Sequence, residues 1–308
     1  MKKGTKIALA LGAAAGAVVG SAWLAYDIAF RGDERRQADH HEIPEEDEAY
    51  REESLKNIDA LLETPYERVS IHSRDGLKLR GKFYAGKEGT PLLLFFHGYR
   101  STAERDGSGG FSLCREKGWN ALLVDQRAHG ESEGKTITFG AKERFDVVEW
   151  ADWAVRRFGG DVSIYLVGVS MGAATVLMAS ALELPEQVKG IWADCGYSTT
   201  EGVVRHAIRR WHLPEGPAFA LTRLGGRLFG GFDLRETTPL EAVKNAAVPI
   251  LLIHGEDDNV VPHDMAAGLK EACAAPGEIV SVPGAHHGMS FYVDNAQYRA
   301  AVERLIQK

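Results

Sequence analysis

The chain has 308 residues, of which 44% are hydrophobic and 26% are charged, and its formal net charge is -7. This composition is typical of a globular protein that buries a full core in one large α/β domain or two smaller ones. No basic stripe, helix-turn-helix pattern or zinc-finger spacing is visible, which argues against a nucleic-acid partner. Cys114, Cys195 and Cys273 are too few and too scattered for a disulfide framework or a CxxC site, so we expect small core residues.

The first 30 residues combine a basic leader with a long apolar run. Three lysines fall within the first six residues, and the chain then runs uncharged from Ile7 to Tyr26. As a helix these twenty residues span about 30 Å, the hydrocarbon thickness of a bilayer. We predict that residues 1–30 are an uncleaved membrane anchor, with the main domain extracytoplasmic because the basic leader precedes the apolar run. A cleaved signal peptide is the alternative, since Gly20 and Ala22 offer a small-x-small site.

Residues 31–64 form an acidic segment. Between Asp33 and Glu63 there are 12 acidic and 4 basic residues, so the rest of the chain is close to neutral. We interpret this segment as a tether that is partly helical after Pro44. Its charges are expected on a solvated face, and its contacts are expected with the main domain.

From residue 65 to residue 308 the pattern changes to alternating strands and helices. Two alternating segments flank the turn Arg74–Gly76 and predict an antiparallel hairpin. Later apolar runs, separated by helical stretches, predict a mostly parallel α/β sheet flanked by helices. These runs are PLLLFFHG, NALLVDQR, SIYLVGVS, VKGIWADCG, PILLIHG and GEIVSVPG. Residues 199–247 do not fit one crossover helix and are predicted to form a small helical, cap-like insertion after the sixth strand.

Residues Gly168–Gly172 read Gly-Val-Ser-Met-Gly and lie where an apolar strand ends and a small-residue helix begins. A nucleophile elbow needs this strand-turn-helix context, because its serine occupies a strained turn that tolerates only small neighbours. An ordinary serine in a tight glycine bend would show the same local sequence pattern. Ser170 is therefore a candidate nucleophile whose partners have to come from elsewhere in the chain.

Two pairs of residues later in the chain offer the acid and the base. Asp257 and Asp258 follow the apolar run that ends at Gly255, where the acid of such a site is expected. His286 and His287 occupy a glycine-bounded loop near the end of the chain. The residues alone leave both choices open. No metal site is expected at the histidines, because neither an HExxH motif nor a third ligand at a recognisable spacing accompanies them.

Two backbone N–H groups are candidates for binding the oxyanion. One belongs to Met171, which follows the serine at the start of a helix whose dipole favours negative charge. The other is expected from the loop after the third strand, where Tyr99 follows His97 and Gly98. Because chain order, spacing and context agree, we predict that Ser170 is a nucleophile.

From about residue 66 onward the chain resembles the α/β-hydrolase superfamily. It looks most like the bacterial serine hydrolases related to the dipeptidyl-peptidase and acylaminoacyl-peptidase type and to ABHD and BEM46-like proteins. The matching segments are FFHGYRS, DQRAHGES, GVSMGAA, ADCGY, DLRETTPLEAV, LLIHGEDDNVVP and GAHHG. The resemblance implies that Asp258 is the acid and His287 the base, with Asp257 and His286 as runners-up and Asp194 as a further fallback.

The resemblance also implies that the turn holding Asp125, Arg127 and His129 organises structure and stays outside the site. It implies a Ser-His-Asp serine hydrolase that needs neither metal nor organic cofactor. We expect a carboxylesterase acting on small to medium acyl esters of small molecules. The alternatives are a peptidase or thioesterase of the same fold, or a non-catalytic, membrane-tethered binding module.

The insertion is expected to determine substrate preference through apolar side chains that line an acyl pocket. These candidates are Trp211, Leu213, Phe219, Leu221, Leu228 and Phe229.

Overall fold

An eight-stranded mixed sheet forms the centre of the molecule in the computed structural model, which describes residues 3–32 and 39–307. The strand order is β1-β2-β4-β3-β5-β6-β7-β8. Strand β2 pairs antiparallel with both β1 and β4, and the remaining neighbours pair in parallel. The predicted mostly parallel sheet is therefore confirmed. The strands are β1 (Glu67–His72), β2 (Lys78–Tyr84), β3 (Leu92–Phe96), β4 (Asn120–Asp125), β5 (Ile164–Val169), β6 (Val188–Asp194), β7 (Ile250–Gly255) and β8 (Gly277–Val282).

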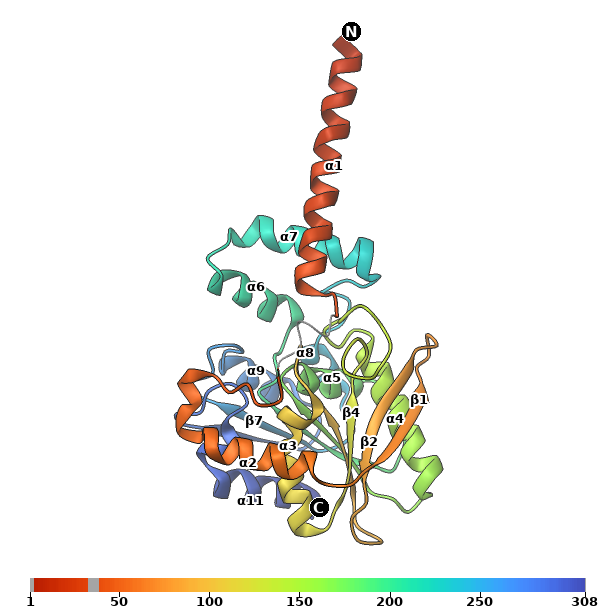
Figure 1. Ribbon diagram of the computed structural model, residues 1–308, viewed down its shortest axis with the longest axis vertical. Helices are drawn as coiled ribbons and strands as arrows, with labels where there is room; N and C mark the ends of the chain where they lie inside the picture. The colour runs from red at the N-terminus through yellow and green to blue at the C-terminus, as the bar shows by residue number, and fades with distance from the viewer. Residues whose placement is uncertain (1–2, 33–38, 308) are drawn as a thin grey trace.

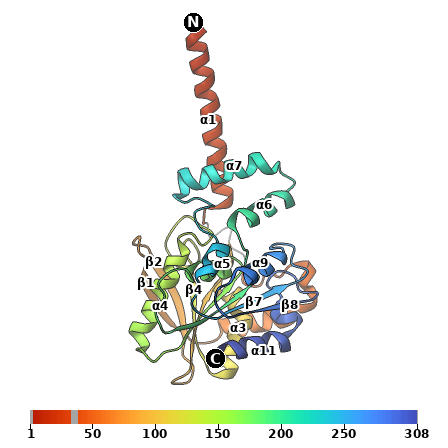
Figure 2. The same cartoon turned by 180° about the vertical axis from the view of Figure 1, so that it is seen from behind.

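Helices cover both faces of the sheet (Figures 1 and 2). Along β3, Leu92 and Leu94 pack on one face while Leu93 and Phe95 pack on the other, because successive strand residues point to opposite sides. The helices of the first face are α4 (Glu143–Phe158), α5 (Met171–Ala179) and α9 (Asp264–Ala272). Those of the second face are α2 (Arg51–Leu62), α3 (Ala103–Lys117) and α11 (Asn295–Ile306), together with the short α10 (Ser290–Val293).

Helix α3 has a capping residue at each end. Thr102 occupies the N-cap, and its hydroxyl accepts a hydrogen bond from the Arg105 N–H at 3.2 Å. Gly118 ends the helix in the left-handed region at φ 74°, which glycine adopts without steric cost. The first end fixes the length of the loop that joins β3 to α3, and the second fixes the short connection from α3 to β4.

Helix α1 (Lys3–Ala29) leads away from the body of the molecule, and α7 crosses it near its lower end (Figures 1 and 2). One side of its last two turns packs on the insertion. Ala22 is fully buried, and its carbonyl oxygen lies so close to Gly225 that a Cβ there would be 2.3 Å away. Phe30 is fully buried and packs edge-on against Phe232 at a centroid distance of 5.0 Å.

Short helices make up the insertion after β6. They are α6 (Thr200–Arg210), α7 (Glu215–Gly225), the π-helical η3 (Gly226–Gly230), α8 (Pro239–Ala242) and the 3-10 helix η4 (Val243–Asn245). Helices α6 and α7 stand above the sheet, beside the end of α1 (Figure 1). We call α6, α7 and η3 the cap.

The acidic segment packs on the main domain. It contains the 3-10 helix η2 (Glu45–Tyr50), which is followed directly by α2. Helix α2 lies against α3, and Leu61 is fully buried there. Residues 33–38 of this segment, and Lys2 of the basic leader, lie outside the described residues.

The turn after β4 ties together α4, the β1–β2 hairpin turn and the loop after β3. Arg127 is 5% exposed and binds both carboxylate oxygens of Asp146 on α4, at 2.6 and 2.7 Å. It also binds Asp75 in the β1–β2 hairpin turn at 2.9 and 3.0 Å. The side chain of His129 accepts from the Arg100 N–H at 3.0 Å and thereby supports the loop after β3.

We expect Arg127→Ala to lower the free energy of unfolding by about 3–5 kcal/mol, because it leaves the buried Asp146 carboxylate without its partner. The matched control is Arg74→Ala, which removes an ion pair to Glu149 from a side chain that is 53% exposed. Its expected cost is at most about 1 kcal/mol. Urea unfolding followed by circular dichroism measures both. Equal, small losses for the two variants would contradict a structural role for the Arg127 cluster.

Candidate active site

Ser170 occupies a strained turn between β5 and α5. Its φ of 56° and ψ of -115° lie in a region that residues with a side chain rarely adopt. Only glycine fits at the two positions flanking Ser170, because a Cβ there would collide with neighbouring backbone. A Cβ on Gly172 would lie 1.9 Å from the Phe96 carbonyl oxygen, and one on Gly168 would lie 2.3 Å from the Gly172 backbone. Helix α5 can approach β5 and the end of β3 this closely only because both positions are glycine. The turn presents Ser170 at the end of the sheet.

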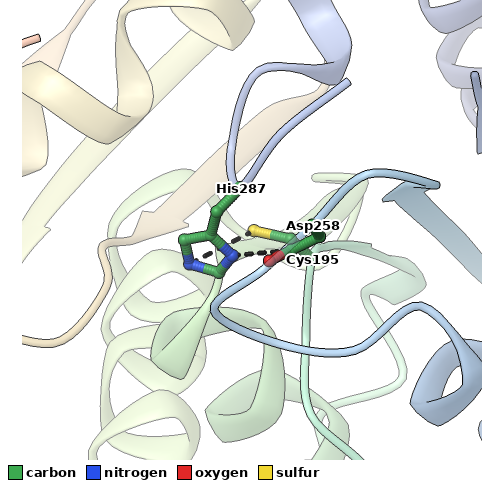
Figure 3. Close-up of side chains that lie close together, drawn as sticks. All are labelled: Cys195, Asp258 and His287. Atoms are coloured by element: carbon green, nitrogen blue, oxygen red, sulfur yellow. Dashed lines mark hydrogen bonds and ion pairs between the residues drawn. The ribbon is translucent and has the colours of Figure 1, made fainter. Parts of the chain in front are cut away.

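A continuous chain of hydrogen bonds joins Asp258, His287 and Ser170. His287 Nε2 lies 2.9 Å from Ser170 Oγ, and His287 Nδ1 lies 2.7 Å from Asp258 Oδ2. Asp258 comes from the loop after β7 and His287 from the loop after β8. Because these parallel strands end at the same edge of the sheet as β5, the two loops meet above the turn. Figure 3 shows the imidazole of His287 directed at Asp258.

The carboxylate of Asp258 is fixed by several donors. Oδ1 accepts from the backbone N–H groups of Val260 and Val261 at 2.8 Å each. His254 Nε2 lies 3.2 Å from Oδ2. Burial disfavours the charged form, but the hydrogen bonds from His254 and His287 outweigh it and hold the pKa of Asp258 well below its usual range. Asp258 is therefore ionised and can orient His287 at any working pH.

The other candidate acids and the second histidine have different surroundings. Asp257 is exposed, and its backbone N–H binds the Ala285 carbonyl at 3.1 Å. Asp194 is buried and accepts from the Tyr298 hydroxyl at 2.7 Å. Burial raises the pKa of Asp194 to about 6. His286 Nδ1 lies 2.8 Å from Asp47 in the acidic segment, so this ring is paired with a carboxylate other than Asp258.

The surroundings of His287 favour a proton acceptor. Burial disfavours the imidazolium, yet the hydrogen bond and the charge of Asp258 outweigh this and raise the pKa of His287 above its usual value. An Nδ1–H donated to Asp258 leaves Nε2 as an acceptor toward Ser170. This arrangement can take the proton of the serine hydroxyl.

The predicted oxyanion donors lie on the two segments beside Ser170. Met171 is the first residue of α5, where backbone N–H groups have no acceptor within the helix. The loop carrying Tyr99 passes close by, since a Cβ on Gly98 would lie 3.3 Å from Ser170 Cβ. Asp106 holds this loop by accepting from the Gly98 N–H at 2.6 Å. The assignment of Tyr99 and Met171 as oxyanion donors stays a prediction.

Cys195 lies beside the hydrogen-bonded residues Asp258, His287 and Ser170. Nothing in the sequence around Cys195 indicated this location. Its Sγ is 3.9 Å from His287 Nε2, and a ligand atom of each of Cys195, Asp258 and His287 lies within 4.8 Å of the others (Figure 3). A thiolate is the form that binds metals and attacks carbonyls. Burial raises the pKa of Cys195 well above its usual value, so this thiol stays protonated and packs as a small core side chain.

Two cavities meet at Ser170. One has a volume of about 550 Å³ and is lined almost entirely by apolar side chains from α1, the cap and the floor around Met171. The other has a volume of about 160 Å³ and is more polar, with Asp47, Ser101 and Arg105 among its lining residues. The nucleophile thus lies where an apolar chamber and a polar recess join.

Half of the residues expected to form the acyl pocket line the apolar chamber. Trp211, Leu213 and Leu221 do so. Phe219 is instead buried in the packing of the cap. Leu228 and Phe229 are exposed on the surface of the cap.

Sequence reasoning missed the lining residues of α1 and of the acidic segment. The α1 residues that line the chamber are Ser21, Leu24, Ala25, Ile28 and Ala29. They recur every three or four positions, which is the spacing of one face of a helix. That periodicity is the only signal that the sequence offered.

Comparisons with known proteins agree with this geometry. A family model described as "alpha/beta hydrolase fold" matches residues 91–213, and one described as "Serine hydrolase (FSH1)" matches residues 226–287. The chain is 26% identical to the uncharacterized protein YqkD of Bacillus subtilis, over 77% of each chain. It is 24% identical to the bifunctional esterase/perhydrolase DCH of Acinetobacter calcoaceticus, over 71% of this chain and 92% of the relative.

A solved structure shares the fold. The esterase Pf2001 of Pyrococcus furiosus aligns with a TM-score of 0.66 and 23% identity, covering 80% of this chain and 92% of the esterase. The sheet order, the serine elbow and the two family models converge. The chain has the α/β-hydrolase fold and belongs to the α/β-hydrolase superfamily.

Proposed function

We propose that this protein is a serine carboxylesterase in which Ser170 is the nucleophile, His287 the general base and Asp258 the orienting acid. The observation that carries the proposal is the line of hydrogen bonds at 2.9 and 2.7 Å that ends on a serine held at a positive φ. Esterases among the related proteins support it. An apolar chamber that reaches the serine suits the acyl part of an ester.

Acylation begins when His287 takes the proton of the Ser170 hydroxyl. Ser170 Oγ then forms a bond to the ester carbonyl carbon, and the carbonyl oxygen becomes an oxyanion. Asp258 holds the imidazole in the tautomer that accepts at Nε2 and stabilises the imidazolium. The ester C–O bond breaks as His287 returns the proton to the leaving alcohol.

The backbone N–H groups of Tyr99 and Met171 are proposed to bind the oxyanion. A preorganised donor of this kind contributes about 2.7–4 kcal/mol to transition-state stabilisation, because it needs no reorganisation when the charge develops. Water then attacks the acyl-enzyme with His287 again as the base, which releases the carboxylic acid and restores Ser170. The proposed cycle uses no metal and no organic cofactor.

We also propose that α1 is an uncleaved membrane anchor with the hydrolase domain on the extracytoplasmic side. The helix contains an 18-residue window, Gly12–Ala29, with a mean hydropathy of 1.2, which a signal sequence would share. Packing of its lower end favours the anchor. Ala22 is buried against α7, and Tyr26 donates or accepts a hydrogen bond at 2.7 Å with Thr136.

Ser170→Ala is expected to lower kcat for p-nitrophenyl butyrate by about 10⁴-fold or more, because the covalent route disappears. Release of p-nitrophenol by the full chain in detergent measures it. The control is Ser112→Ala, a serine on α3 whose hydroxyl only binds the Gly109 carbonyl. A matched amide and a matched thioester substrate separate esterase from peptidase and thioesterase activity. A Ser170→Ala variant with wild-type turnover would refute the proposed nucleophile.

The activity is expected to rise with pH through the pKa of His287, which Asp258 raises above its usual value, since only the neutral imidazole accepts a proton. Asp258→Asn removes the charge that raises this pKa, so the rise should move to lower pH. The asparagine should also hold His287 in the wrong tautomer, which should reduce kcat by about 10⁴-fold. The measurement is a kcat/KM profile from pH 5 to 9 for both proteins. An unchanged profile in Asp258→Asn would show that Asp258 is not the partner of the base.

Full-length protein expressed in bacteria is expected to stay in the membrane pellet after an alkaline carbonate wash and to dissolve in detergent. Its intact mass should include α1, because the anchor is not removed. Mass spectrometry of the purified chain provides the readout. A carbonate-soluble chain that starts at Trp23, directly after the small-x-small site, would contradict the anchor and favour a secreted enzyme.

A further inference from the structure

We propose that the lower end of α1 is a wall of the acyl-binding chamber, and that the substrate is a lipid-like ester with a long acyl chain. This inference rests on the proposed esterase function and names its substrate class. It goes beyond an anchor, because it makes α1 a determinant of specificity. It also extends the small to medium acyl groups that the sequence alone led us to expect.

One face of α1 is directed at the chamber over two turns. Leu24, Ala25 and Ile28 lie on this face, between Ser21 above and Ala29 below. The opposite wall comes from α6, and the floor includes the nucleophile and Met171. An acyl chain bonded to Ser170 would therefore run between α1 and α6.

The position of α1 at the chamber is fixed by contacts with the cap and with the loop after β3. Ala22 and Phe30 are fully buried in the cap. Two polar bonds tie the last turn of α1 to the loop after β3, from the Tyr99 hydroxyl to the Ala29 carbonyl at 2.9 Å and from Arg100 to the Ile28 carbonyl at 2.6 Å. Since Tyr99 is also a proposed oxyanion donor, the wall and the reaction centre share one loop.

The chamber suits a long alkyl chain in size and in polarity. Its volume of about 550 Å³ falls within the range of about 300–1,000 Å³ typical of small-molecule sites. Its lining is almost wholly apolar, whereas the recess on the other side of Ser170 offers Ser101 and Arg105. A molecule with one apolar and one polar end fits both sides of the nucleophile.

The surface around the chamber is apolar where a bilayer carrying α1 would meet it. Exposed side chains there include Trp23 on α1 at 48%, Trp211 at 63% and Leu228 at 53%. Tryptophan is favoured at the membrane interface. The uncharged part of α1 above the cap, residues 7–20, rises about 21 Å, which is most of a hydrocarbon core of about 30 Å. The chamber thus begins at the level where lipid headgroups lie.

The test uses two variants that narrow the chamber from α1, Leu24→Trp and Ile28→Trp. Both side chains are more than 40% exposed, so neither change overpacks the core. The matched control is Val18→Trp, which enlarges an exposed α1 residue above the chamber. The full chain is assayed in lipid nanodiscs with p-nitrophenyl butyrate and p-nitrophenyl palmitate.

We expect wild-type kcat/KM to be higher for palmitate than for butyrate. Leu24→Trp and Ile28→Trp should lower kcat/KM for palmitate by about 10-fold or more. Even one methylene group too many in an apolar pocket changes kcat/KM by about 10–200-fold, and the indole ring is larger. The value for butyrate should fall by a clearly smaller factor, since its short chain ends near Ser170. Val18→Trp should leave both values unchanged.

Two results would overturn the inference while the esterase stands. One is wild-type turnover of butyrate that exceeds that of palmitate. The other is a kcat/KM for p-nitrophenyl palmitate that stays at the wild-type level in both Leu24→Trp and Ile28→Trp. If wild type hydrolyses neither ester, the proposed function itself fails, and the assay distinguishes that outcome from a failure of the chamber alone.

Discussion

The strained turn at Ser170 is the constraint on which the rest of the site depends. The serine keeps a positive φ because α5 packs against β5 where Gly168 lacks a Cβ and against the end of β3 where Gly172 lacks one. That approach fixes the serine at the carboxyl edge of the parallel strands. The loops after β7 and β8 end at the same edge, so Asp258 and His287 need only short excursions to reach it. The reaction proposed for the site follows from this packing.

Most of the fold could be predicted from the sequence, because apolar runs and glycines report on local geometry. The strand-turn-helix around Ser170 is an example. The choice within each adjacent pair could not be made from residue types, since Asp257 and Asp258 differ only in burial and hydrogen bonding. His286 is likewise separated from His287 by a partner distant in sequence, Asp47. Contacts of that kind depend on the tertiary fold.

For a related reason, the sequence could not predict that α1 lines the apolar chamber. A bilayer and an acyl chamber select the same apolar side chains, so the face of Leu24 and Ile28 looks like any other part of a membrane helix. The acidic segment poses the same problem, because a charged run looks solvated until Asp47 is seen beside His286. Both segments precede the hydrolase domain in sequence, and both contribute lining residues to the cavities at Ser170. The site is thus assembled from the segments that precede the hydrolase domain as well as from the domain itself.

The most direct test of the account is covalent labelling of the full-length protein in detergent with an alkyl fluorophosphonate, followed by peptide mapping. We predict one adduct, on Ser170, that forms at a rate reduced about 10³-fold or more in His287→Ala, since the base activates the serine. A folded wild-type protein that forms no adduct, or that is labelled on another serine, would contradict the central claim that Ser170 is an activated nucleophile.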